Sequence, residues 1–200
     1  MLTPNDEMIT GILLAAGMGK RFGSQKLMAK LPSGTPVAVT SWRNLETANK
    51  KSFAVIRQND SELRSLFEDE NIPFVVCEDA HMGMSRSLLT GIQSSLKSSG
   101  WIIALGDMPF IDPKTIKKII CDMSNIKHKT IFRPIFQKQA GNPVGLNREL
   151  LNELMTLKGD QGAREIIKRD KRRIHQIPVN DSGIIKDIDT QRDLLELNKD

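Results

Sequence analysis

The chain has 200 residues, 39% of them hydrophobic and 26% charged, which is typical of a globular protein that buries a core without disulfides or metals. No apolar run approaches the roughly 18–20 residues needed to span a bilayer, and the first ten residues carry acids where an export signal needs cations. The two cysteines lack metal-ligand spacing and fit a reducing cytoplasm, while the net charge of +5 suits a protein whose ligands are anions.

Short apolar runs alternate with helical patterns along most of the chain. We predict strands over Thr10–Ala15, Phe53–Arg57, Phe74–Cys77, Trp101–Leu105, Thr130–Ile135 and Ile174–Pro178. We predict helices over Val37–Asn49, Asp60–Glu70, Met84–Ser98, Pro113–Met123, Arg148–Thr156, Gly162–Arg169 and Gln191–Asn198. This order predicts an α/β fold with a doubly wound, mostly parallel sheet of the Rossmann-like type, in a single domain over residues 1–200. In such sheets, ligands bind beyond the carboxyl ends of the strands.

A glycine-rich loop, Leu14–Lys26, follows the first predicted strand. Its spacing fits neither the dinucleotide fingerprint, whose third glycine would fall at Phe22, nor the P-loop, which needs a glycine before Lys-Ser or Lys-Thr. Glycines let the backbone approach an anion, and the cations at Arg21 and Lys26 can neutralise phosphate oxygens. The alternative is an ordinary strand-to-helix turn with solvated cations. The residues that we predict to bind a nucleoside triphosphate here are Leu14, Ala15, Ala16, Gly17, Gly19, Arg21 and Lys26.

Gly83 and Ser85 lie at the start of a predicted helix. Free N–H groups at a helix start can bind an anion or the edge of a base, so we predict that both residues contact the nucleotide. Simple helix capping explains the same two residues equally well.

The continuously apolar strand Trp101–Leu105 is followed by Gly106-Asp107-Met108-Pro109. An aspartate at this strand end is placed to hold Mg²⁺, which prefers one or two carboxylates together with substrate phosphates. Helix capping is the alternative for Asp107, but Asp112 already caps the helix predicted from Pro113. Because a single carboxylate holds Mg²⁺ weakly, we expect a second acid, and the segment Asp187–Leu194 supplies candidates.

The segment from Gln137 to Asp160 interrupts the alternation of strands and helices. It contains Gly141-Asn142-Pro143-Val144-Gly145, and we expect it to form a loop that closes over a second substrate.

With these motifs in place, the chain resembles the molybdenum cofactor cytidylyltransferases and the wider molybdopterin nucleotidyltransferase-like family. The resemblance runs nearly end to end. The segments that carry it are Leu14–Lys26, Gly34–Val37, Gly83–Leu88, Ala104–Pro109, Gly141–Gly145, Gly159–Arg164 and Asp187–Leu194.

The resemblance implies several site residues. Asp189 matches the first acid of the family's D-T-P-x-D-L segment, which completes a metal site, although Gln191 replaces the usual proline; Asp187 is a weaker alternative. On the acceptor side, the resemblance implies roles for Asn142 (where many relatives have His), for Pro143 and for Arg164.

The activity implied is the transfer of CMP from CTP to the terminal phosphate of molybdopterin, which releases pyrophosphate and gives molybdopterin cytosine dinucleotide. Ala16, in L-A-A-G, favours CTP over GTP. Arg21, Lys26 and Asp107 would be catalytic, and Asp107 and Asp189 would hold Mg²⁺. Residues 1–110 would bind the nucleotide and residues 111–200 the acceptor.

Two alternatives remain open at this point. One keeps the chemistry but takes a sugar or polyol phosphate as acceptor; the other is a non-catalytic nucleotide-binding protein that delivers the cofactor to a molybdoenzyme. The partners expected are CTP or another NTP, an anionic phosphate acceptor, and a molybdoenzyme or its chaperone. We expect no membrane partner. Nucleic acid is also disfavoured, because only 4% of residues are aromatic and the chain shows no RNP-like or helix-turn-helix motif.

Overall fold

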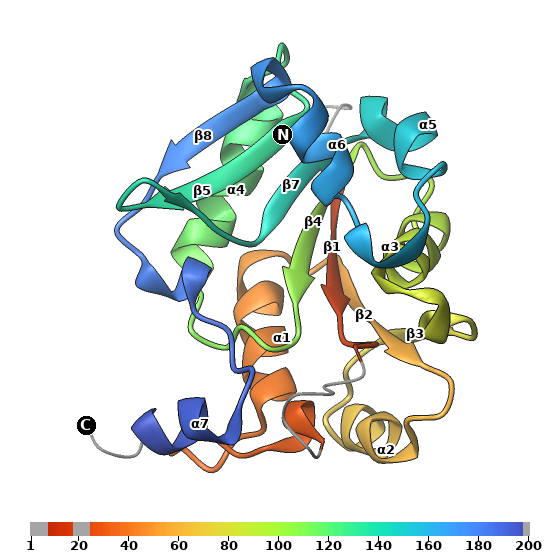
Figure 1. The fold of residues 1–200 in the computed structure, drawn as a ribbon, viewed down its shortest axis with the longest axis vertical. Coiled ribbons are helices and arrows are strands. Elements are labelled where there is room, and N and C mark those ends of the chain that lie inside the picture. The colour runs from red at the N-terminus through yellow and green to blue at the C-terminus, as the bar shows by residue number, and fades with distance from the viewer. Residues whose placement is uncertain (1–7, 18–24, 198–200) are drawn as a thin grey trace, which may run out of the picture.

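The structure is a computed structural model of the chain, and it describes residues 8–17 and 25–197. One half of its sheet is parallel and has the order β3-β2-β1-β4 (Figure 1). These strands are β1 (Ile9–Leu14), β2 (Ser52–Arg57), β3 (Phe74–Cys77) and β4 (Gly100–Leu105). The predicted α/β fold with a mostly parallel sheet is therefore confirmed.

The other half of the sheet is mixed. β7 (Val144–Asn147) runs antiparallel between β4 and β5 (Ile131–Phe136). β6 (Gln139–Ala140) forms a hairpin with β5, and β8 (Ile174–Pro178) pairs with β5 in parallel. The sheet thus joins the predicted nucleotide-binding and acceptor-binding parts of the chain.

The prediction of a loop from Gln137 to Asp160 is wrong, because this segment supplies the strands β6 and β7. They are followed by a 3₁₀ turn (Arg148–Leu150) and α5 (Leu151–Leu154), where a helix over Arg148–Thr156 was predicted. The strand β7 was hidden by Gly145, which breaks the apolar pattern between the buried Val144 and Leu146. A Cβ at Gly145 would lie 2.6 Å from the Sδ atom of Met123. Close packing against the neighbouring helix therefore requires glycine where a strand pattern would show a side chain.

The helices are α1 (Val37–Ala48), α2 (Ser61–Asp69), α3 (Met84–Gln93), α4 (Pro113–Asn125), α5 (Leu151–Leu154), α6 (Arg164–Arg169) and α7 (Gln191–Leu197). Short 3₁₀ turns at Lys26–Met28, Ala80–Met82 and Gly159–Gln161 lie between them. The predicted helix from Gly162 begins only at Arg164, because Gly162 has a φ of +52°.

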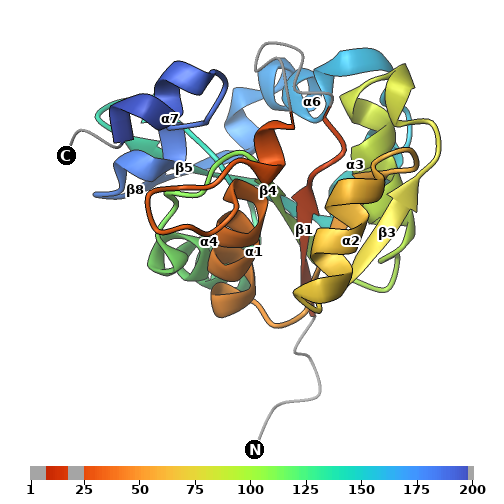
Figure 2. The same ribbon diagram turned by 90° about the horizontal axis from the view of Figure 1, so that it is seen from below.

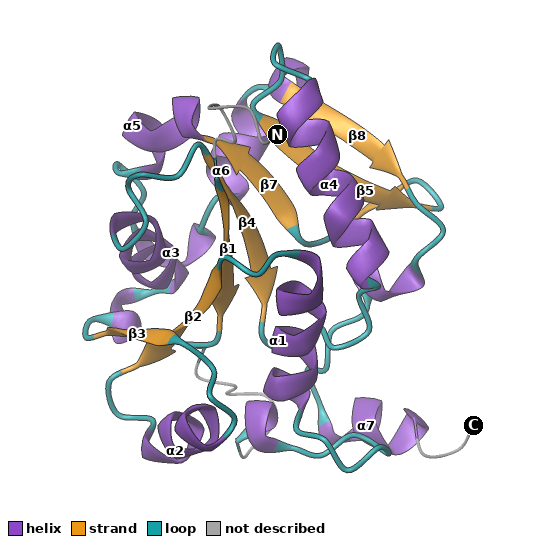
Figure 3. Cartoon of the chain, turned by 180° about the vertical axis from the view of Figure 1, so that it is seen from behind, coloured by secondary structure: helices purple, strands orange, loops and turns teal. Residues whose placement is uncertain are grey.

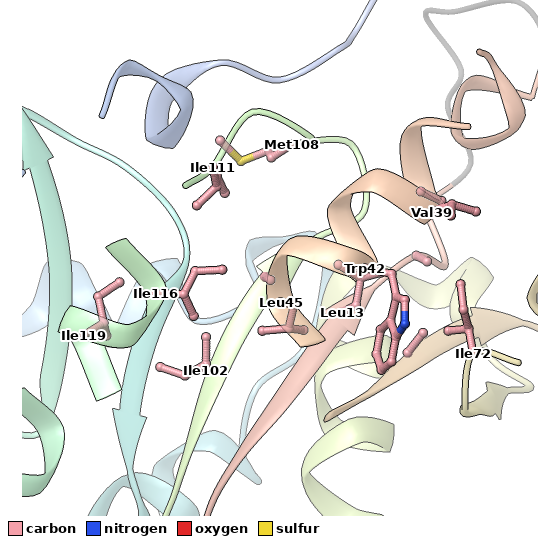
Figure 4. Packing of buried hydrophobic residues seen from close by; sticks show 14 of the residues in the cluster. Leu13, Val39, Trp42, Leu45, Ile72, Ile102, Met108, Ile111, Ile116 and Ile119 are labelled. Atoms are coloured by element: carbon pink, nitrogen blue, oxygen red, sulfur yellow. The ribbon is translucent and has the colours of Figure 1, made fainter. Parts of the chain in front are cut away.

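The helices cover both faces of the sheet (Figures 2 and 3). On one face, Trp42 and Leu45 of α1 and Ile116 of α4 pack with Leu13 and Ile102 of the central strands (Figure 4). On the other face, side chains of α3, α5 and α6 pack with a second set of strand residues; this set comprises Ile12, Val55, Ile103, Ile131 and Leu146. No helix within the described ranges combines the length and the hydropathy needed to cross a membrane.

Candidate active site

Lys26 connects the two acids that the sequence predicts as metal ligands. Its Nζ atom donates hydrogen bonds to Oδ2 of Asp107 at 2.7 Å and to Oδ1 of Asp189 at 2.9 Å. The lysine side chain is only 12% exposed. Burial alone would lower the pKa of Lys26, but the hydrogen bonds and charges of Asp107 and Asp189 outweigh it and raise the pKa above its usual value. The ammonium group therefore stays charged in its place between the carboxylates of Asp107 and Asp189.

Hydrogen bonds to the backbone of Gly106 fix the segment that carries Asp107 at the end of β4. The N–H of Gly106 donates to the carbonyl of Leu14, which joins the ends of β4 and β1 at 2.9 Å. The hydroxyl of Ser41, in α1, donates to the carbonyl of Gly106 at 2.9 Å. Asp107 thus stands beyond the carboxyl ends of two central parallel strands, where α/β sheets bind ligands.

A second backbone contact brings the C-terminal acids to the same place. The N–H of Ile188 donates to the carbonyl of Asp107 at 2.9 Å, and the Ile188 side chain is buried against Leu31 and Val37. Asp187 and Asp189 flank this anchor on either side. The structure therefore brings Asp189 and Asp107 to the same lysine, and their predicted role as metal ligands stays a prediction.

Asp193 orders the turn that carries Asp189. Its Oδ2 atom accepts hydrogen bonds from the N–H groups of Asp189 at 2.8 Å and Thr190 at 2.7 Å. The bond from Thr190 is the main cause that lowers the pKa of the Asp193 carboxyl. This role of Asp193 was not predicted from the sequence, although a Thr-x-x-Asp spacing before a helix is the signal for such a cap.

The fit of this group to a divalent metal can be judged from Asp107 and its neighbours. Oδ1 of Asp107 is buried and has no hydrogen-bond partner in the described part of the chain, so this oxygen lacks the donor or cation that a buried carboxylate requires. Burial, followed by the charge of Asp189, raises the pKa of the Asp187 carboxyl. Within residues 8–17 and 25–197, no three acid, histidine or cysteine side chains form a ready metal centre. Asp107 and Asp189 therefore fit an ion that takes its other ligands from substrate and water.

The predicted nucleotide-binding loop begins at the end of β1. Ala15 and Ala16 are buried, and the N–H of Ala15 donates to the carbonyl of Val55 at 2.9 Å, while Gly17 is exposed. Gly19 and Arg21 lie outside the described residues, so their predicted roles stay predictions. A cavity of about 330 Å³ opens beside this loop. Its lining residues are Ala16, Arg57, Gln58, Asn59, Glu78, Ala80 and His81.

Gly83 and Ser85 connect the start of α3 to another of the resembling segments, Gly159–Arg164. Gly83 has a φ of +116°, and a Cβ there would lie 2.5 Å from the carbonyl carbon of Gly159. The buried hydroxyl of Ser85 donates to the carbonyl oxygen of Gly159 at 2.6 Å. The side chain of Ser85 therefore serves this contact, and the nucleotide-binding role of both residues stays a prediction.

The three predicted acceptor residues lie around the β6–β7 connection and at the start of α6. The N–H of Asn142 donates to the carbonyl of Ile184 at 2.9 Å, and the peptide bond from Asn142 to Pro143 is cis. Arg164 is exposed and is the first residue of α6. Arg133, whose pKa is lowered by burial and by the positive charge of Arg164, was not predicted from the sequence. A lone arginine inside the apolar strand Ile131–Phe136 is the signal that could have found it.

Comparison with known proteins shows which family this chain matches. The MobA-like NTP transferase domain matches residues 11–175. The purine catabolism protein PucB of Bacillus subtilis is 24% identical over 192 residues, covering 91% of this chain and 92% of that protein. A probable molybdenum cofactor guanylyltransferase of Natranaerobius thermophilus is 32% identical over 123 residues, covering 60% of this chain and 57% of that protein.

Solved structures share the fold. The crystal structure of Rv0371c from Mycobacterium tuberculosis matches with a TM-score of 0.83 at 24% identity, covering 96% of this chain and 99% of that one. A second crystal structure of Rv0371c is a complex with manganese and matches with a TM-score of 0.77 at 23% identity, covering 96% of this chain and 98% of that one.

Proposed function

Because the chain belongs to the MobA-like NTP transferase family, we propose that this nucleotidyltransferase transfers CMP from CTP to the terminal phosphate of molybdopterin, with release of pyrophosphate. The observation that carries the proposal is the meeting of Lys26, Asp107 and Asp189 at the end of β4. A transferase of this kind needs fixed charges of both signs at one point, to balance a triphosphate and to hold its counterion. These three side chains come from distant parts of the sequence and supply both.

The reaction needs little covalent chemistry from the protein. A phosphate oxygen of the acceptor is already a nucleophile at neutral pH, so the main tasks are to align it with the α-phosphorus and to stabilise charge. Lys26 would donate to the phosphates, together with Arg21 and the backbone N–H groups of the loop that begins at Ala16. Because the pKa of Lys26 is raised, its ammonium is present throughout the neutral pH range.

Asp107 and Asp189 would hold the Mg²⁺ ion in this proposal. When bound, the ion neutralises charge on the reacting phosphates. The buried, unpartnered Oδ1 of Asp107 supports its assignment as a ligand. A protein with the same fold has been solved as a complex with manganese, which supports the use of a divalent ion.

The choice of CTP rests on Ala16, since relatives that use CTP typically carry L-A-A-G at this position. A second candidate is transfer of a guanylyl group from GTP, which the 32% identity to a probable molybdenum cofactor guanylyltransferase favours. Both candidates share molybdopterin as the acceptor. We also propose that the product passes in the cytoplasm to a molybdoenzyme or its chaperone, in keeping with the free thiols of Cys77 and Cys121.

Pyrophosphate release tests the proposal. The assay offers each of the four NTPs with Mg²⁺, with and without molybdenum-loaded molybdopterin, and with a sugar phosphate as a separate acceptor. We expect release only when CTP and the pterin are both present. Release with GTP and the pterin would replace CTP by the second candidate. Nucleotide binding without release under any condition would contradict the transferase proposal.

A further inference from the structure

Arg133 is a half-buried cation that forms no ion pair with an acid in the part of the chain that the structure describes. It lies within β5, and its Nε atom is inaccessible to solvent and has no hydrogen-bond partner in the described part of the chain. One terminal nitrogen is 3.5 Å from the carbonyl oxygen of Gly141, at the outer limit of a hydrogen bond. A buried polar atom without a partner is costly, so the unpartnered Nε–H of this half-buried arginine points to a ligand that completes its contacts.

A second arginine, Arg164, begins α6. Ile166 of α6 belongs to the same buried cluster as Ile131 of β5 and Leu146 of β7, and these three elements lie in the upper part of Figure 1. Burial lowers the pKa of Arg133, and the positive charge of Arg164 lowers it further. Among the residues that the structure describes, neither guanidinium forms an ion pair with a carboxylate. The positive charge of Arg164 thus acts on Arg133, and no described carboxylate is paired with either guanidinium.

We propose that Arg133 and Arg164 together bind a phosphate group of the acceptor, an inference that rests on the proposed function. Guanidinium groups offer forked donors that match phosphate oxygens, and two of them balance a doubly charged phosphate monoester. The carbonyl oxygen of Gly141, in the β6–β7 connection, borders the guanidinium of Arg133. Arg133 is then a binding residue, and its uncompensated charge is the stability cost of the site.

Inorganic phosphate is the probe for this site, added to the full chain without nucleotide or metal. Its binding is followed by the Nε–Hε signals of the arginines in ¹H–¹⁵N NMR spectra, where loss of one signal in Arg133→Lys identifies Arg133. We expect that signal to shift with phosphate. Arg133→Met and Arg164→Met should each raise the phosphate Kd at least about tenfold. The matched control is Arg43→Met, which removes an exposed arginine on α1 and should change the Kd less than about twofold.

Thermal unfolding separates binding from a structural role. Arg133→Met keeps an unbranched side chain but removes the unpaired charge, so its Tm should equal or exceed that of the wild type. A lower Tm with an unchanged phosphate Kd would overturn the proposal, because Arg133 would then only support the fold. If Arg133→Met does not fold, the phosphate Kd of Arg164→Met and of Arg133→Lys decides the question in the same way.

The nucleotide also carries phosphates, so the same variants are titrated with CTP and with GTP. We expect both nucleotide Kd values to change less than about twofold. A tenfold loss of nucleotide affinity would assign the two arginines to the triphosphate and overturn the proposal. Phosphate binding that depends on both arginines, in a chain that releases no pyrophosphate, would support this site and contradict the proposed function alone.

Discussion

The ammonium nitrogen of Lys26 lies 2.7 Å from Oδ2 of Asp107, although 81 positions separate the two residues in the sequence. The same nitrogen lies 2.9 Å from Oδ1 of Asp189. One positive charge between two negative ones leaves the group with an excess of negative charge, so it still attracts a cation. The lysine holds the two carboxylates close together, and in the proposed reaction this would reduce the reorganisation that catalysis requires.

Replacing Lys26 tests its role in charge stabilisation. Lys26→Met should lower turnover by roughly two to three orders of magnitude, the range found when one charge-stabilising donor is removed. The measurement is pyrophosphate release with saturating CTP, molybdopterin and Mg²⁺. Lys30→Met is the matched control, because Lys30 is an exposed residue of the same segment, and its activity should stay within twofold of the wild type. Equal activities of the two variants would remove Lys26 from the mechanism.

Asp107→Asn tests the metal assignment by keeping the shape of the side chain while removing its charge. We expect turnover with Mg²⁺ to fall below detection and the binding of Mn²⁺, followed by its EPR signal, to weaken at least about tenfold. The melting curve without metal should change little, since the backbone contacts of Gly106 and Ile188 hold the segment in place. Full turnover of Asp107→Asn with Mg²⁺ would contradict the metal assignment. The control is Asp69→Asn, which changes an exposed acid of α2.

Much of the fold was predictable because its signals are local. The run Trp101–Leu105 is apolar at every position, and a strand buried on both faces requires this. Asp112 was predicted to cap the following helix, and its carboxylate accepts from the N–H of Lys114 at 2.8 Å. Asp107 was also predictable, because a strand end followed by glycine and an acid places that acid at the ligand-binding edge.

What the sequence did not show depends on contacts between distant segments. The strand β7 is specified by the space beside Met123, which only glycine at position 145 can share. The bridge from Lys26 to both acids also escaped prediction, since the lysine alone was assigned to phosphate. Arg133 went unnoticed for a similar reason, because its significance depends on the proximity of Arg164, 31 positions away in the printed sequence.

A pH prediction concerns Asp79 and Arg86, which join the turn before Gly83 to α3. The hydrogen bond from Arg86 holds the pKa of the Asp79 carboxyl below its usual value. The stability contributed by this pair is therefore complete above the ordinary aspartate pKa of about 4 and is lost as the pH falls through the lowered pKa. The difference in Tm between wild type and Arg86→Met should shrink from pH 7 to pH 3. A Tm difference that stays constant with pH would mean that the arginine stabilises by packing alone. In an Asp79→Asn background, the effect of Arg86→Met on Tm should no longer depend on pH.

Gly83→Ala tests the close packing of the start of α3 against the Gly159 turn. Gly83 has a φ of +116°, and the added Cβ would meet the carbonyl carbon of Gly159 at 2.5 Å, which is too close for non-bonded carbons of two separate residues. We expect a loss of about 2–4 kcal/mol in the free energy of unfolding, from backbone strain and forced separation together. Gly34→Ala is the matched control, since Gly34 has a φ of +80° but open space around its Cβ position, and it should cost about 1 kcal/mol. Chemical denaturation gives both free energies of unfolding, and equal losses would show that backbone strain alone matters.

The same two variants also test the predicted place of Gly83 beside the nucleotide. A drop in CTP affinity in Gly83→Ala beyond that in Gly34→Ala would support it.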